Sequence, residues 1–132
     1  MGERQAPRRR KDTRAARLRS ARELFRIGLP HALGVRLRSL TPRKVTAEMR
    51  VKAPHFNRNR RVGGGVLMAF ADVMGAAGAV ANRPLGFRGG TLESKTNFFA
   101  NSSGGRIQGS TFSYPIRSNK GAIFSKIHSV NL

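Results

Sequence analysis

Three consecutive glycines, Gly63, Gly64 and Gly65, run directly into an apolar segment that extends from Val66 to Ala81 and holds one carboxylate, Asp72. If the segment is a helix, the glycines lie at its N-terminus, where backbone N–H groups lack helical acceptors and the positive end of the macrodipole lies. Asp72 follows Gly64 by eight residues, roughly 12 Å along the axis at about 1.5 Å per residue. The segment thus offers an anion-binding end and a lone acid.

The side chains around Asp72 separate by size when the segment is drawn as a helix at about 100° per residue. Those within roughly 60° of the acid are mostly small: Gly65, Met68, Ala69, Gly75, Ala76 and Ala79. Those pointing the opposite way are mostly bulky: Val66, Leu67, Phe70, Met74 and Ala77. We expect the bulky stripe to pack on a sheet and the small stripe to admit a second helix or a substrate. A structural partner for the acid inside an ordinary buried helix is the alternative.

The chain length and charge limit the remaining possibilities. A chain of 132 residues forms one domain with a real core. The absence of cysteine excludes disulfides, a thiolate nucleophile and a zinc–cysteine site. The formal charge of +20 is uneven, because residues 1–62 carry 19 Lys or Arg against 4 acids and residues 63–132 carry 7 against 2. The basic excess therefore belongs to the first half.

Residues 1–28 form a basic N-terminal extension, and residues 29–132 are expected to form the main domain. Residues 1–12 have too little apolar surface to join a core, so they are either a polyanion-attracting arm or a solvated tail. After Thr13, a plausible N-cap, apolar residues recur at helical spacing until Gly28 and Pro30 end the helix. An Arg-rich amphipathic start also resembles a mitochondrial transit peptide. We expect a cytoplasmic protein, or a mitochondrial one if the source is eukaryotic.

A membrane span is an alternative for Val62 to Ala81, which has the length of a spanning helix and one charge. Against it, the segment opens with glycines and places Asp72 at its centre, where an ionised acid is costly. We therefore expect no membrane span.

The flanking sequence predicts strands. Gly34 to Leu40 and Val45 to Val51 form a probable hairpin, and Thr91 to Ala100, Arg106 to Ile116 and Ala122 to Val130 follow the apolar segment. The order of hairpin, helix and strands predicts an α+β domain with one helix laid on an antiparallel sheet.

Three segments of the chain, in order and at matching spacing, resemble the hotdog-fold acyl-CoA thioesterases of the phenylacetate-pathway (PaaI-like) family. They are LGVRLRSLTPRKVTAEMRV, the pair His55-Phe56-Asn57 and the glycine run, and GGVLMAFADVMGAAGAVANRPLG followed by TLESKTNFF. The resemblance runs from Leu33 through Val130. It implies the hotdog fold, in which a curved antiparallel sheet wraps one long central helix.

The resemblance also implies an acyl-CoA thioesterase with a site shared between subunits of a homodimer or homotetramer, and with no cofactor. Asp72 matches the general base or nucleophile, Gly64 the glycine whose N–H polarises the thioester carbonyl, and Asn57 an amide that orients water or substrate. Thr91 matches a Ser or Thr near the carboxylate in some members. Asp72 would come from one subunit, and Asn57 and Gly64 from the other.

Substrate contacts are expected around the same turn. The glycines flanking Gly64, Gly63 and Gly65, would bind substrate, and Arg58, Arg60 and Arg61 would attract the phosphates of coenzyme A, with a merely solvated surface as the alternative. The sequence departs from the family at Gly63, where a His is usual, and at Arg60, where a Gly is usual. The last predicted strand is also followed by no further one, so we expect a missing C-terminal strand and an open sheet edge.

Thioester hydrolysis suits these residue types independently of the resemblance. An N–H at a helix start stabilises the oxyanion, and a carboxylate supplies the base or nucleophile. No G-x-S-x-G or H-E-x-x-H motif competes, and His31, His55 and His128 are too dispersed to suggest a metal site or a triad. The alternative is a non-catalytic basic protein that binds nucleic acid or an anionic surface on a hotdog dimerisation scaffold. Aromatic residues are few and not interleaved with the basic cluster, so nucleic acid is not the expected partner.

Overall fold

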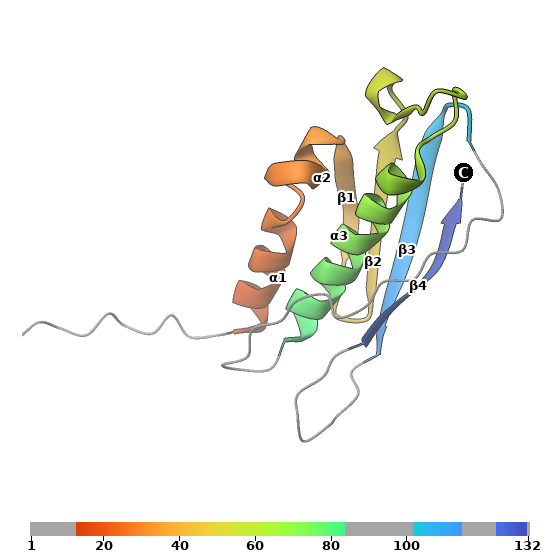
Figure 1. Ribbon diagram of the computed structural model, residues 1–132. Coiled ribbons are helices and arrows are strands. Elements are labelled where there is room, and N and C mark those ends of the chain that lie inside the picture. The colour runs from red at the N-terminus through yellow and green to blue at the C-terminus, as the bar shows by residue number, and fades with distance from the viewer. Residues whose placement is uncertain (1–12, 84–101, 115–123, 132) are drawn as a thin grey trace, which may run out of the picture.

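The computed structural model describes residues 13–83, 102–114 and 124–131, and it shows a single long helix lying across an antiparallel sheet (Figure 1). The strands pair in the order β1-β2-β3-β4. The elements are α1 (Arg14–Glu23), α2 (Gly28–Ala32), β1 (Val35–Leu40), β2 (Lys44–Arg50), the 3₁₀ turn η1 (Ala53–His55), α3 (Gly64–Asn82), β3 (Arg106–Tyr114) and β4 (Phe124–Asn131). The predicted α+β arrangement of hairpin, helix and strands is confirmed.

The predicted hairpin is present and closed by a short turn. The N–H of Thr41 donates to the carbonyl of Lys44 at 2.9 Å, and the Thr41 hydroxyl accepts the N–H of Lys44 at 3.0 Å. A threonine hydroxyl that pairs with its own turn stabilises such a connection. The hairpin pairs Val35 with Met49 at its open end and Leu40 with Val45 at the turn.

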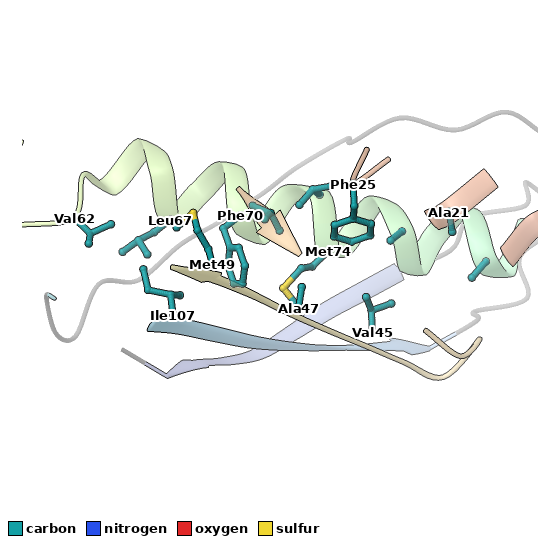
Figure 2. Close-up of a cluster of buried hydrophobic side chains, with 14 residues drawn as sticks. Ala21, Phe25, Val45, Ala47, Met49, Val62, Leu67, Phe70, Met74 and Ile107 are labelled. Atoms are coloured by element: carbon teal, nitrogen blue, oxygen red, sulfur yellow. The ribbon is translucent and has the colours of Figure 1, made fainter. Parts of the chain in front are cut away.

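The two faces of α3 follow the predicted division. Its bulky stripe is buried against the sheet, where Phe70 and Met74 meet Val45, Met49 and Ile107 in the core shown in Figure 2. Its other face is exposed or half-exposed at Gly65, Met68, Ala69, Asp72, Gly75, Ala76 and Ala79. By length and mean hydropathy α3 could also cross a membrane. The core helix of a soluble protein meets the same criterion, and one face of α3 is buried in the core.

Close packing of α3 on the sheet depends on Gly109 of β3. A Cβ atom built on Gly109 would lie 2.6 Å from Cε1 of Phe70 and 2.7 Å from Sδ of Met74, well inside contact distance. Any larger residue would therefore push the helix and the sheet apart or force these side chains to move.

The predicted N-terminal helix is present as α1, capped by the hydroxyl of Thr13, and it lies beside α3 (Figure 1). Ala21 and Phe25 are buried in the common core. One expectation is corrected, because α1 ends at Glu23 and Gly28 and Pro30 belong to a second short helix, α2. A proline is tolerated there because N–H groups of a first helical turn have no helical acceptor to lose.

The last two strands agree with the sequence, although each is shifted at its ends. The strand expected from Arg106 to Ile116 ends at Tyr114, and the strand expected from Ala122 to Val130 occupies Phe124–Asn131. The strand expected at Thr91 to Ala100 lies outside the described residues. Among the described strands β4 pairs with β3 alone. The expectation of a missing last strand and an open sheet edge stays a prediction, because the segment from Thr91 to Ala100 lies outside the described residues.

Candidate active site

The glycine run forms the start of α3 and presents backbone donors. Gly63 is the N-cap, with φ −62° and ψ 138°, and its carbonyl accepts the N–H groups of Val66 and Leu67. Its own N–H donates to the carbonyl of His55 at 2.8 Å. Within the described residues, the N–H groups of Gly64 and Gly65 have no acceptor, so this helix start offers two adjacent donors and a positive macrodipole end.

Gly63 therefore acts as the cap of the helix, and its N–H is not available to a substrate. Its backbone angles suit any residue, and an added Cβ would meet the His55 carbonyl oxygen at 3.5 Å and Cγ2 of Val66 at 3.8 Å, both ordinary contacts. Neither the conformation nor the space at position 63 requires glycine.

His55 is a structural support for this terminus. Its side chain is buried, and Nδ1 accepts the N–H of Lys52 at 3.0 Å. The same residue's carbonyl receives the Gly63 N–H. The sequence did not single out His55 for this role, because the contact between residues eight positions apart depends on the turn that separates them.

Asn57 organises the turn between η1 and α3. Its side-chain carbonyl accepts the N–H of Asn59 at 2.9 Å and the N–H of Arg61 at 3.2 Å, and its own N–H donates to the Arg61 carbonyl at 2.7 Å. An antiparallel bridge between Phe56 and Val62 closes the loop at its base. The amide oxygen of Asn57, expected to orient water or substrate, is thus used to fix this loop.

The loop carries the three arginines expected to attract phosphate. Arg58, Arg60 and Arg61 are exposed, and together they place three cations on the segment that leads into α3. Arg60 has φ +57°, a left-handed conformation that favours glycine. The family's usual glycine at this position is therefore explained by the backbone.

Asp72 lies on the exposed face of α3 and engages in a contact within the protein, in keeping with the predicted orientation. It follows Gly64 by roughly 12 Å along the helix axis. Within this chain the acid and the donor glycines are therefore well separated on one helix. Thr91, the remaining expected site residue, lies outside the described residues.

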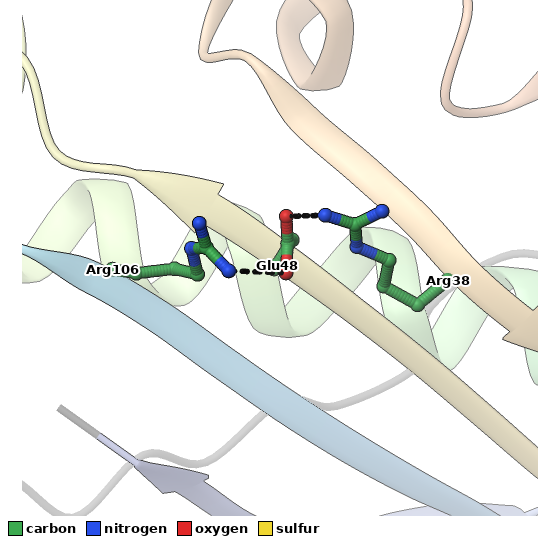
Figure 3. A network of polar contacts seen from close by, with 3 residues as sticks. All are labelled: Arg38, Glu48 and Arg106. Carbon is green, nitrogen blue, oxygen red and sulfur yellow. Dashed lines mark hydrogen bonds and ion pairs between the residues drawn. The ribbon is translucent and has the colours of Figure 1, made fainter.

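A charged network on the sheet was not found from the sequence. Figure 3 shows the carboxylate of Glu48 between Arg38, to which it is hydrogen-bonded, and Arg106, whose Nη1 lies 3.6 Å from Oε2. The hydrogen bond from Arg38 lowers the pKa of Glu48, and the charges of Arg106, Arg38 and Arg36 lower it further, whereas burial acts the other way. The arginine partners of Glu48 come from β1 and β3, so no local pattern in the sequence connects the three residues.

No group of three His, Asp or Glu side chains with metal-binding geometry occurs in residues 13–83 or 102–113.

Neither a protein-family model nor a curated protein matches the chain. Several solved structures are similar to this chain. A thioesterase family protein from Silicibacter pomeroyi superposes with a TM-score of 0.69 at 17% identity, covering 87% of this chain and 91% of its own. The E. coli PaaI protein from the phenylacetic acid degradation operon gives 0.68 at 14% identity, covering 86% and 90%. Zebra fish thioesterase superfamily member 2 gives 0.60 at 18% identity, covering 86% and 92%.

These likenesses extend over most of each chain. The chain therefore has the hotdog fold of the thioesterases that it resembles. At these identities the likeness establishes the fold, and the activity is argued separately.

Proposed function

We propose that the protein is a thioesterase that hydrolyses acyl-CoA. The observation that carries this proposal is the pairing of two uncommitted N–H donors at Gly64 and Gly65 with a single exposed carboxylate, Asp72, on the same helix of a hotdog fold. Acyl transfer to water needs this combination, because an oxyanion forms on the carbonyl while a base or nucleophile acts at its carbon.

In the proposed reaction the N–H of Gly64 binds the thioester carbonyl oxygen and stabilises the negative charge that develops on it. Asp72 either takes a proton from the attacking water or attacks the carbon itself to form an anhydride, which water then hydrolyses. In both cases the C–S bond breaks, the carboxylic acid is released, and the thiolate of coenzyme A takes up a proton.

The length of α3 favours a site built from two subunits. A carbonyl that meets a donor at about 3 Å and a nucleophile at about 3.5 Å spans at most about 8 Å between them, and a base that acts through the attacking water adds about 3 Å. Gly64 and Asp72 of one helix are roughly 12 Å apart along the axis. We therefore place Asp72 of one subunit against Gly64 and Asn57 of another, in a homodimer or homotetramer.

The arginine loop supports the choice of coenzyme A as the leaving group. Arg58, Arg60 and Arg61 are held on a loop whose base is closed by the Phe56–Val62 bridge and whose turn is fixed by Asn57. Three exposed arginines on a fixed loop that leads into the donor glycines suit the phosphates of coenzyme A. The acyl group remains to be identified with a substrate panel.

The test is the release of free thiol from a panel of acyl-CoA substrates by three variants and the parent. Asp72→Asn keeps the shape of the side chain but removes the base or nucleophile, so most activity should be lost. Gly64→Pro removes the N–H at the first helical position, where proline is accepted and where the extended Gly63 suits a residue before proline. Gly64→Ala retains the N–H and is the matched control.

We expect Gly64→Pro to lower kcat by on the order of 10²–10³ relative to Gly64→Ala, the usual loss for one oxyanion donor. Circular dichroism and thermal unfolding should show all variants folded. Equal rates for the Pro and Ala variants would remove the donor from the mechanism, and an Asp72→Asn variant within about twofold of the parent would remove the acid.

A further inference from the structure

The sheet has an outer face, turned away from α3, that is strongly basic. In the register of the sheet, Glu48 lies opposite Arg36 and Gln108. Lys44 lies opposite Phe112, and Arg50 lies opposite Arg106. Because side chains alternate along a strand, all these residues lie on the same face of the sheet. The odd-numbered residues of β2 and β3, among them Met49 and Ile107, face the helix instead. The exposed cations of the outer face are Arg36, Arg38, Lys44, Arg50 and Arg106.

Glu48 is the sole carboxylate among the described residues of this face, and it holds two of the five cations in place. Its oxygens meet Arg38 and Arg106 from opposite sides, as Figure 3 shows, and its side chain is only 11% exposed. The side chains of Arg38 and Arg106 are 55% and 54% exposed, so they are far more accessible to solvent than the acid between them. One buried charge thus orients two exposed ones and leaves the face with a clear positive excess.

Between these charges the surface is hollowed and polar. A cavity of about 260 Å³ is lined by the side chains of Arg38, Thr46, Glu48, Gln108 and Ser110 and by Ala47 and Gly109. Hydroxyl, amide and guanidinium groups are the donors that proteins use for phosphate oxygens. The outer face therefore has a positive electrostatic potential, which attracts anions, and hydrogen-bond donors, which can bind phosphate oxygens.

From this arrangement we infer that the outer sheet face binds the phosphate backbone of a nucleic-acid duplex without reading its sequence. A second copy of the same face would set arginine against arginine, which disfavours self-pairing. Insertion into a membrane is disfavoured because the large exposed apolar side chains of the described residues, Ile27, Leu29 and Met68, lie on or next to α2 and α3. Base stacking is disfavoured because Nζ of Lys44 lies 5.2 Å above the ring of Phe112.

This surface is independent of the proposed active site. The donor glycines and Asp72 belong to α3, and the sheet separates that helix from the outer-face cations (Figures 1 and 3). The expectation that nucleic acid is not a partner rested on the lack of stacking residues, whereas the duplex contacts inferred here are to phosphate alone.

The test compares two triple variants of the full chain with equal charge change. Arg36→Gln/Lys44→Gln/Arg50→Gln lowers the charge of the outer face and leaves Arg38, Glu48 and Arg106 in place. Arg58→Gln/Arg60→Gln/Arg61→Gln lowers the charge of the loop before α3 by the same amount. Binding to a fluorescent DNA duplex of mixed sequence is measured by anisotropy across a salt series, and unfolding is followed to show that both variants fold.

We expect the outer-face variant to bind at least about tenfold more weakly than the loop variant, with a slope of log K against log salt reduced by up to about 2.7, since each lost phosphate contact removes about 0.9. Equal losses in the two variants would show that only net charge matters and would overturn the proposal. So would binding to phosphatidylserine vesicles that depends on the outer face while the duplex does not bind.

Discussion

Arg60 adopts a backbone conformation that suits glycine better than arginine. Its φ of +57° lies in the left-handed region, and the surrounding loop is fixed by the two hydrogen bonds to the Asn57 side chain and by the Phe56–Val62 bridge. Such strain persists where neighbouring structure imposes it, and it often accompanies a functional side chain. An exposed arginine on a fixed loop that leads into the donor glycines is consistent with phosphate binding.

Replacing this arginine by glycine should therefore raise stability and weaken substrate binding. Arg60→Gly removes a left-handed strain of about 1–2 kcal/mol. Glycine loses more conformational entropy on folding, which costs about 0.5–1 kcal/mol. The free energy of unfolding should therefore rise by about 0.5–1 kcal/mol. Urea unfolding measures the gain, and KM for acyl-CoA should rise while kcat stays near that of the parent. Arg58→Gly, at a position without positive φ, is the control and should give no gain in stability. A less stable Arg60→Gly variant would contradict this account of the loop.

At the scale of elements, the fit of α3 on the sheet depends on the missing side chain of Gly109. Phe70 and Met74 fill the space above it, and both are fully buried. The C-terminal end of the helix is fixed separately, because Nδ2 of Asn82 donates to the carbonyl of Pro42 at 2.5 Å and Arg17 of α1 donates to the carbonyl of Arg83 at 2.8 Å. The helix therefore has little freedom to move away from an added methyl group.

Gly109→Ala should accordingly destabilise the domain by about 1–3 kcal/mol, the usual cost of overpacking a filled core. Gly75→Ala on the outward face of α3 is the matched control, since an added Cβ there meets no atom within 4 Å. It should raise stability by up to about 1 kcal/mol through helix propensity. Thermal unfolding of both variants compares the two effects. If Gly109→Ala were as stable as the parent, the helix and the sheet would be less closely packed than described.

The elements whose patterns are local were predictable from the sequence. The hairpin has a turn between two segments in which apolar and polar residues alternate. In α3 the helical spacing of the bulky residues alone identifies the face that packs in the core. What escaped prediction depends on contacts between distant segments. Gly109 matters only because α3 crosses β3, and Glu48 gains its partners from β1 and β3. The helix α2 is not predictable from its Gly28 and Pro30, which are typical of a helix end, although a first helical turn accommodates the proline.

The candidate site was predictable to a similar extent. The sequence identified Gly64 and Asp72, whose positions follow from one helix, and it identified the arginine loop as a feature next to them. It did not foresee that Asn57 would fix its own turn or that Gly63 would give its N–H to His55, because both depend on the folded loop.

At the scale of the whole molecule, one subunit holds the parts of a site but keeps them apart on α3. If the working site joins the Gly64 end of one subunit to the Asp72 of another, two different inactive variants should complement each other. Subunits of Asp72→Asn and Gly64→Pro that are unfolded, mixed in equal amounts and refolded together should regain up to about one quarter of the parent activity, since half of randomly formed dimers are mixed and each has one intact site.

Thiol release from acyl-CoA measures the recovery, and each variant refolded alone is the control. Size-exclusion chromatography with light scattering confirms that the refolded material is oligomeric. No recovery in properly mixed oligomers would place Asp72 and Gly64 of the same subunit in one site, and would require a conformation in which they approach each other.

Position 63 can tolerate substitution during the evolution of such a protein. Its ordinary backbone angles and the 3.5 Å clearance to the His55 carbonyl mean that a side chain can be gained or lost at this position while the helix start is kept. The neighbouring donor works through a backbone N–H, which most substitutions preserve. A lineage with this fold is therefore free to vary the residue at position 63 by single mutations that leave the N–H of Gly64, the proposed oxyanion donor, in place.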